Sequence, residues 1–187
     1  IKRCKILVKN MKIVCLIPVR LNSKRIKNKN FIKIKNLTLL ELVCKKIVKS
    51  KYISNFYIAS EKSNKVQNLV EKNKKINYFA RSKKSSTHIA KTEIVIKEFI
   101  KKIDCDLVVL VQVTNPFVSY KYLDEAIIKL KRKNYDTLLS VVKSKDFLWQ
   151  FSSPTTPLNY NYRNRKMSQK LKGHLIENGS FYIFYKS

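Results

Sequence analysis

The sequence predicts an α/β fold in which helices cover both faces of a mainly parallel sheet. Short apolar runs alternate along the chain with amphipathic stretches of helical length, and DLVVLVQ at 106–112 is the strongest strand signal. This alternation is typical of parallel strands joined by helical crossovers. The 187 residues, 44% of them apolar, suffice for one globular domain whose core needs no disulfide.

Hydrophobic periodicity then gives the elements in order. We expect strands at 12–18, 55–60, 77–80, 106–112, 137–142 and 180–185. We expect helices at 39–50, 63–72, 93–102 and 120–133. Thr38 is placed to cap the first helix. The polar stretch 81–90 predicts a loop, and 143–176, with Pro154 and Pro157, predicts further loops.

The charge is strongly basic, with 41 Lys and Arg against 12 Asp and Glu and a net charge of +29. Such a charge favours contact with phosphate groups. The lysines are spread over nearly every segment, however, whereas a nucleic-acid binder gathers them on one face among aromatic residues. An A- and T-rich coding sequence would give the same composition. We therefore do not expect a nucleic-acid partner.

The chain's other bulk features indicate a cytoplasmic protein. The cysteines, at 4, 15, 44 and 105, lack zinc spacing and are expected to be core residues in a reducing compartment. No run reaches the ~18 apolar residues of a membrane span, and Pro18 and Arg20 interrupt the run that a signal peptide would need. Residues 1–10 form a basic extension ahead of Met11, which is a candidate start, so the predicted domain is 11–187.

The loop after the first strand carries the strongest chemical signal. In parallel sheets, ligands bind at the carboxyl ends of the strands, and PVRLNSKRIKNKN at 18–30 surrounds Asn22 and Ser23 with five cations. Cations, a hydroxyl and free backbone N–H groups suit a polyphosphate. The loop is not a Walker motif, because GxxxxGK is absent. A solvated basic loop is the alternative reading.

Four segments in register resemble the N-acylneuraminate (CMP-sialic acid) cytidylyltransferase family. The first is the loop itself, which is similar to the family pattern ARxNSKxxPxKN at Arg20, Asn22, Ser23, Lys24, Lys29 and Asn30. The others are VQVTNPF at 111–117, similar to LQPTSPL, GHLIENGSFYIF at 173–184, similar to ENGSFY, and, more weakly, 81–90. Together they span 12–185 in the family's order.

The resemblance implies a Rossmann-like nucleotidyltransferase fold of the GT-A type, a three-layer sandwich. It implies a transferase that joins CTP to an acidic nine-carbon sugar, with Mg²⁺, for lipopolysaccharide or capsule biosynthesis. The anomeric hydroxyl would attack the α-phosphorus in line, so catalysis would be positioning and charge neutralisation. The family forms homodimers through the segment that here carries Phe147, Trp149, Phe151 and Tyr160. The alternative is a monomer in which these aromatic residues fold back.

The resemblance also implies roles for individual residues. Arg20 and Lys29 would hold the triphosphate, with Ser23 and Lys24 shaping the loop and Asn30 reaching the nucleotide sugar, and Asn22 would also bind CTP. Arg81 and the Ala90 backbone would lie against cytosine. Gln112 and Asn178 would face the sugar, although Gln112 could instead only end a strand. Arg165 would meet the sugar carboxylate, because a guanidinium binds carboxylates in a bidentate way; an apparent two-residue insertion shifts its register. Lys24 and Arg165 are the residues assigned to catalysis.

The sequence departs from the family pattern at several positions. Lys27 and Val113 replace prolines, and His88 replaces an Asp and is expected to be a solvated residue. The family's DxD-like metal pair has one lookalike, Asp104 and Asp106, which we expect to form a turn at the amino end of a strand. We therefore expect no metal ligands in this chain, a domain that is incomplete at its carboxyl end, and slow turnover.

Two other functions remain open on the sequence. One is a degenerate, inactive copy that acts as a basic nucleic-acid-associated module. The other is a cytidylyltransferase for the eight-carbon acid 3-deoxy-manno-octulosonate, whose loop usually has an STR-like sequence followed by KP. Here NSK and Lys29-Asn30 favour the nine-carbon branch.

Overall fold

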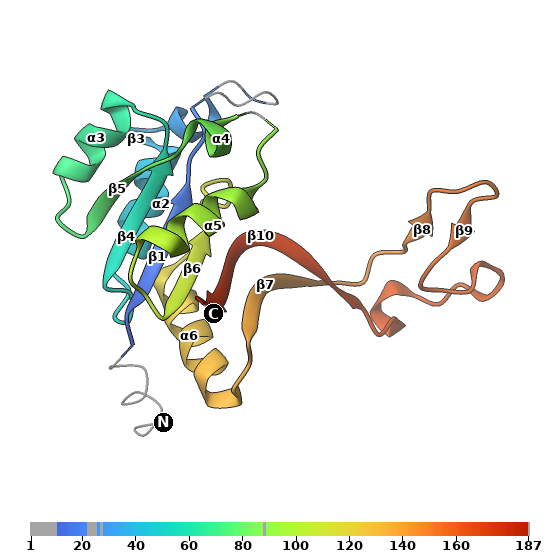
Figure 1. Cartoon of the computed structure of the whole chain (residues 1–187). Helices are drawn as coiled ribbons and strands as arrows, with labels where there is room; N and C mark the ends of the chain where they lie inside the picture. Colours follow the sequence, from blue (N-terminus) through green and yellow to red (C-terminus); the bar gives the residue numbers. More distant parts are fainter. Residues whose placement is uncertain (1–10, 22–25, 27, 88, 187) are drawn as a thin grey trace. The chain divides into compact units, whose positions relative to one another are not determined.

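A six-stranded, mainly parallel sheet forms the centre of the protein in the computed structural model, which describes residues 11–21, 26, 28–87 and 89–186 (Figure 1). The strand order is β5-β4-β1-β6-β10-β7. The strands are β1 (Ile13–Pro18), β4 (Asn55–Ser60), β5 (Ile76–Ala80), β6 (Leu107–Val111), β7 (Thr137–Ser144) and β10 (His174–Tyr185). β1 pairs in parallel with both β4 and β6, and β4 with β5, whereas β10 runs antiparallel to β6. The predicted α/β class is confirmed.

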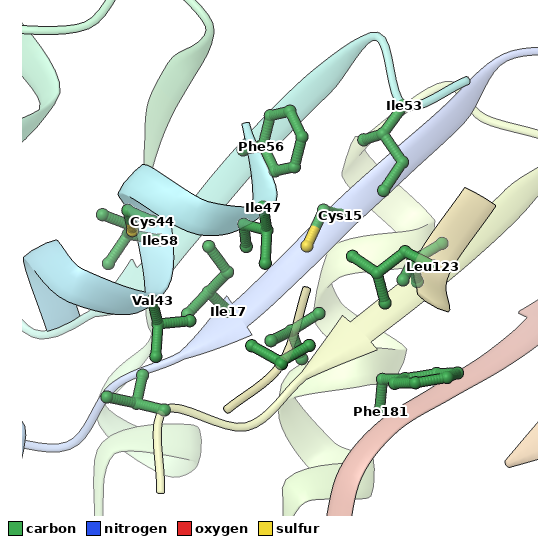
Figure 2. Close-up of a cluster of buried hydrophobic side chains, with 14 of the residues drawn as sticks. Cys15, Ile17, Val43, Cys44, Ile47, Ile53, Phe56, Ile58, Leu123 and Phe181 are labelled. Atoms are coloured by element: carbon green, nitrogen blue, oxygen red, sulfur yellow. The ribbon is translucent and has the colours of Figure 1, made fainter. Parts of the chain in front are cut away.

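Helices cover both faces of this sheet. The helices are α2 (Leu39–Ile47), α3 (Asn64–Glu71), α4 (Lys83–Ser86), α5 (Thr92–Lys102) and α6 (Tyr120–Lys133). Buried side chains of α2, α3 and α6 pack on one face, where Cys15 and Ile17 of β1 point (Figure 2). α5 covers the other face, where Val95 and Phe99 pack on Val14 of the same strand. The alternating side chains of β1 thus build both cores of a three-layer sandwich.

The helix boundaries follow from local chemistry. Thr38 and Glu41 form a capping box at α2, in which the Thr38 side chain accepts from the Glu41 N–H and the Glu41 carboxylate accepts from the Thr38 N–H at 2.8 Å. Ser119 caps α6, which ends where Asn134 adopts a left-handed conformation (φ 52°). Asparagine tolerates that conformation better than most residues do. The predicted bounds of α6 and β4 are confirmed at both ends.

Three predictions differed from the structure by three residues or more. The first helix ends at Ile47 rather than residue 50, since Val48 is its C-cap. The loop predicted at 81–90 contains the single turn α4, capped by Ser82. The last strand begins at His174 rather than residue 180, because β10 has β7 as a neighbour in addition to β6. Short elements also occur at η1 (Lys29–Phe31), β2 (Lys33–Ile34) and β3 (Leu37–Thr38).

The chain divides into two compact units, residues 1–139 with 179–187, and residues 140–178. The second unit holds β8 (Trp149–Gln150), β9 (Thr156–Pro157), η2 (Tyr162–Asn164) and η3 (Ser168–Lys170). Within it, the ring of Tyr160 lies 4.6 Å from that of Phe147 and 5.9 Å from that of Trp149. The predicted aromatic stretch therefore packs partly on itself, while Phe151 is fully exposed.

The described cysteines are core residues, as expected. Cys15, Cys44 and Cys105 are buried and free, and burial raises the pKa of the Cys44 thiol to about 12. These thiols therefore remain protonated at neutral pH. Cys4 and the rest of the expected extension 1–10 lie outside the described residues. Among the helices that the structure describes, none is long and apolar enough to cross a membrane.

Candidate nucleotide site

Four parallel strands end at one edge of the sheet and bring several predicted residues together there. Pro18, the last residue of β1, pairs with Ala59 of β4, and Ser60 pairs with Ala80, the last residue of β5. The residues that follow these strands, namely 19–21, Glu61 and Arg81, must therefore lie along the same edge. This is the edge at which open α/β sheets bind ligands.

Arg20 joins the loop after β1 to the segment before α5. Its Nη2 donates a hydrogen bond to the Ala90 carbonyl, and its own carbonyl accepts one from Asn30 Nδ2 at 3.0 Å. Ala90 and Asn30 are both buried. The structure therefore brings together three of the residues predicted to bind CTP, and each of them also holds another in place.

Arg81 is a buried guanidinium with uncommitted donors. Its side chain is only 8% exposed, and Nη1 donates to the Val19 carbonyl at 3.4 Å. Nε and Nη2 are buried and have no hydrogen-bond partner in the part of the chain that the structure describes. Buried polar groups are nearly always paired, so these two N–H groups indicate a ligand that would accept from them.

The charges around Arg81 partly offset the cost of burying it. Burial lowers the pKa of Arg81 and nearby Arg20 lowers it further, while the carboxylates of Glu61 and Glu98 raise it. Glu61 also accepts a hydrogen bond from the Leu21 N–H at 3.2 Å. Glu98, on α5, accepts one from Ser85 Oγ at 2.6 Å and one from the Ser82 N–H at 3.4 Å.

Sequence reasoning missed both carboxylates. A usable signal existed for Glu61, which is one of only 12 acidic residues and directly follows a strand that ends at the ligand edge. No comparable signal existed for Glu98. It lies in the middle of an amphipathic helix, and its contact with Ser85 depends on α4, which was not predicted.

The remaining predicted residues of the first unit are described in part. Asn22, Ser23 and Lys24, together with Lys27 and His88, lie outside the described residues. Lys29 is half-buried in η1, directly before Asn30. Gln112 directly follows β6, and its backbone N–H donates to the Ser180 carbonyl at 3.0 Å. The backbone of Gln112 thus ends the β6–β10 pairing, while its half-buried side chain belongs to the carboxyl edge of β6.

Arg165 and Asn178 belong to the second unit. The Arg165 guanidinium lies 4.1 Å from the centre of the Phe147 ring, a cation–π contact. Asn178 Oδ1 accepts a hydrogen bond from Ser140 Oγ at 2.7 Å, between β10 and β7. Both side chains thus have contacts within their own unit.

The described residues do not fit a magnesium site held by the protein. Lys12 Nζ donates to Asp104, and the Lys12 N–H donates to Asp106 Oδ2 at 2.7 Å. These contacts lie where β1 and β6 begin, so the pair belongs to a turn at the amino edge, as predicted. Elsewhere in the described ranges, no group of three or more His, Cys, Asp or Glu residues is placed to hold a metal.

A family model described as cytidylyltransferase matches residues 14–185. The chain belongs to the cytidylyltransferase family. The match includes β1, the Arg20 loop, the Arg81 segment and β10, so every described part of the site lies within the family's own pattern.

Two relatives from this family are N-acylneuraminate cytidylyltransferases of fishes. The A form from Danio rerio is 28% identical over 184 residues, which is 95% of this chain and 42% of that protein. The protein from Oncorhynchus mykiss is 29% identical over 181 residues, 94% of this chain and 41% of that protein. The chain thus spans about two fifths of the length of these relatives.

Solved structures share the fold at lower identity. A 4-diphosphocytidyl-2C-methyl-D-erythritol synthase from Anaerococcus prevotii DSM 20548 has a TM-score of 0.70 and 16% identity, covering 97% of this chain and 73% of that one. A CMP:2-keto-3-deoxy-manno-octonic acid synthetase complexed with CTP has a TM-score of 0.69 and 13% identity, covering 94% and 74%. The nucleotidyltransferase fold that the sequence predicted is therefore confirmed.

Proposed function

We propose that this chain carries the nucleotide site of a cytidylyltransferase that transfers CMP from CTP to an N-acylneuraminate or a related acidic nine-carbon sugar. The observation that carries the proposal is the Arg81 guanidinium, which is buried at the ligand edge and has two N–H donors without a partner among the described residues. The family supports nucleotide transfer, and the fish relatives support the sugar class.

Cytosine matches the groups at this edge. Its pairing edge presents one amino donor followed by two acceptors, N3 and O2. Arg81 supplies two donors, and the Ala90 carbonyl, which already accepts from Arg20, has a second lone pair for an amino group. Uracil presents N3–H and O4 where cytosine presents N3 and its amino group. Uracil would therefore place its N3–H donor against the guanidinium donors and its O4 acceptor against the Ala90 carbonyl, which is also an acceptor.

The triphosphate would lie along the basic loop. Arg20 lies two residues after the end of β1, and Lys24 and Lys29 belong to the same loop of the sequence. These cations would neutralise the charge on the phosphates and orient the α-phosphorus for in-line attack by the anomeric hydroxyl of the sugar. Pyrophosphate leaves as the new phosphorus–oxygen bond forms. Such transfer depends on positioning and electrostatics rather than on covalent steps with the protein.

The sugar contacts form part of the same proposal. Gln112 lies at the carboxyl edge of β6, and an amide both donates to and accepts from hydroxyl groups. Arg165 would hold the sugar carboxylate, and Asn178 would bind hydroxyls. The NSK loop and the fish relatives favour the nine-carbon sugar over the eight-carbon alternative. The eight-carbon synthetase is only 13% identical to this chain, so its likeness supports the fold alone.

Thermal unfolding with nucleotides tests the proposal. We expect CTP to raise the melting temperature by mass action, and UTP and ATP to do so much less. Arg20→Ala should remove most of the CTP shift, because a charge-assisted contact contributes roughly 1.5–3 kcal/mol. Formation of a CMP-sugar from CTP and N-acetylneuraminate, followed by mass spectrometry, tests the transfer itself. Equal shifts with all nucleotides, together with salt-sensitive retention on DNA, would instead support the basic nucleic-acid module.

A further inference from the structure

We propose that Glu98 is a positioning residue that balances the buried charge of Arg81 and leaves its Nε and Nη2 groups available to a nucleotide base, with Glu61, the residue after β4, balancing the same charge. This inference rests on the proposed function, since it assigns a role to two carboxylates within the same site.

Hydrogen bonds hold the Glu98 carboxylate against α4. Its Oε2 atom accepts from Ser85 Oγ at 2.6 Å and from the Ser82 N–H at 3.4 Å. Ser85 is completely buried, so this carboxylate is held against α4. Ser82 directly follows Arg81 in the chain, and Glu98 is therefore fixed to the segment that carries the guanidinium.

Neither Glu61 nor Glu98 forms an ion pair with Arg81. A carboxylate near an arginine usually binds it in a bidentate ion pair. Within the described ranges, Arg81 forms no ion pair with Glu61 or Glu98, and its side chain donates a hydrogen bond only to the Val19 carbonyl. Instead, Oε2 of Glu98 accepts hydrogen bonds from Ser82 and Ser85, and Oε2 of Glu61 accepts one from the Leu21 N–H.

A buried guanidinium is costly unless opposite charge lies nearby. Among the described residues, Glu61 and Glu98 favour the charged form of Arg81, and Arg20 opposes it. The two carboxylates therefore offset the burial of Arg81 without using its free donors. A bidentate ion pair would give the same charge balance but would use two of the donors that a base needs.

The variant Glu98→Gln separates this role from simpler ones. Glutamine has the same shape and keeps an acceptor for Ser85 Oγ but loses the charge. The probes are CTP and inorganic triphosphate, which lacks the base, and their dissociation constants are measured by calorimetry on the whole chain. We expect CTP to bind roughly fivefold to tenfold more weakly. Triphosphate should bind equally or more tightly, because a negative charge has been removed.

A second variant, Ser85→Ala, keeps the charge but releases the carboxylate. We expect Glu98 then to turn to Arg81 and weaken CTP binding, again without weakening triphosphate binding. Glu125→Gln, an exposed change of the same kind on α6, is the matched control and should leave both constants unchanged. Glu61→Gln should weaken the binding of CTP, as Glu98→Gln does.

The outcomes are distinct. Tighter binding of both probes by Glu98→Gln would mean that the carboxylate acts only as bulk charge, and equal weakening of both would mean a merely structural role. Either result overturns the inference. If the unaltered chain fails to prefer CTP over UTP, the proposed function itself fails. If it prefers CTP and Glu98→Gln binds CTP normally, only the present inference fails.

Discussion

The buried Arg81 side chain lowers the stability of the free protein and is placed to increase its affinity for CTP. Two of its buried N–H groups have no partner in the described part of the chain, and each such group typically costs about 1–3 kcal/mol. A residue that lowers the stability of the free protein in this way is typical of a binding site, where the ligand supplies the missing acceptors. The stability of the free protein and its affinity for CTP should therefore respond in opposite directions when Arg81 is replaced.

Arg81→Met tests this at the residue scale. Methionine has a similar length and no polar hydrogen, so the free protein should be as stable as before or more stable, by up to about 2 kcal/mol. The melting-temperature shift produced by CTP should largely disappear. Arg132→Met, an exposed change at the end of α6, serves as the comparison. A free protein that unfolds much earlier after Arg81→Met would show that the guanidinium is structural.

At the scale of single elements, the capping box of α2 predicts a difference between two helices. Thr38→Ala should cost about 1 kcal/mol, because the Thr38 side chain accepts from the Glu41 N–H. Ser63→Ala should cost much less, because Ser63 sits at the N-cap of α3 without a side-chain cap bond. Urea denaturation of both variants measures the difference, and equal losses would contradict this account of the cap.

The same box gives a pH dependence with a definite sign. The hydrogen bond from the Thr38 N–H, together with that from its hydroxyl, lowers the pKa of Glu41 below its ordinary 4.5, against the opposing effect of burial. A lowered pKa in the folded state means that the contribution is complete above pH 4.5 and disappears as the pH falls through the folded value. Thr38→Ala keeps the backbone N–H and removes only the hydroxyl, so only the part of its cost that comes from the hydroxyl bond to the Glu41 carboxylate should shrink in acid. Urea denaturation at pH 3 and pH 7 would show this smaller change.

Two glycines allow a further comparison between elements. Gly173 (φ 80°) and Gly179 (φ 62°) both adopt a conformation that other residues avoid. A Cβ at Gly173 would lie 2.8 Å from the Ser144 carbonyl oxygen, whereas at Gly179 it would meet nothing within 4 Å. Gly173→Ala should therefore destabilise the protein more than Gly179→Ala. The melting temperatures of the two variants test this order. The reverse order would show that the close approach of the Ser144 carbonyl does not determine the cost of a side chain at residue 173.

The sequence predicted those elements that have both a clear period and a clear boundary. α6 and β4 were predicted at their observed bounds because apolar periodicity and flanking polar residues agree there. The first half of β10 was missed because HLIENG contains Asn178 and Gly179, which are poor strand residues, and its pairing depends on a strand 30 residues away or more. The site residues came from the resemblance, but their burial and the free donors of Arg81 required the packed structure.

For the whole molecule, the net charge of +29 predicts a background of weak anion binding. Such binding falls steeply between about 50 mM and 200 mM salt, whereas a built site holds its ligand through buried contacts that salt screens less. We expect any small shift with ATP to vanish over this range and the CTP shift to persist in larger part. Melting curves in a salt series measure this, and a parallel decline of both shifts would reduce CTP binding to surface charge.

The assembly of the whole molecule is also open to measurement. We propose that the second unit mediates a homodimer, since it exposes Phe151 completely and also Trp149, Leu158 and Met167. Exposed apolar side chains gathered in one segment are typical of interfaces. Light scattering at micromolar concentration should give twice the chain mass of 22.1 kDa, and Phe151→Lys should shift it toward the monomer. A monomeric mass for the unaltered chain would contradict the proposal.

The position of β10 in the sheet determines when this protein can finish folding. Phe181 of β10 pairs with Val111 of β6, about 70 residues earlier in the chain. Until β10 arrives, β6 presents a fully apolar strand with one unpaired edge. On a ribosome, the strands from β1 to β6 emerge long before this edge can be closed. Synthesis therefore includes an interval in which the centre of the future sheet is open to other chains. The yield of folded protein should depend on how quickly β10 is synthesised after β6, or on a chaperone that covers β6 in the meantime.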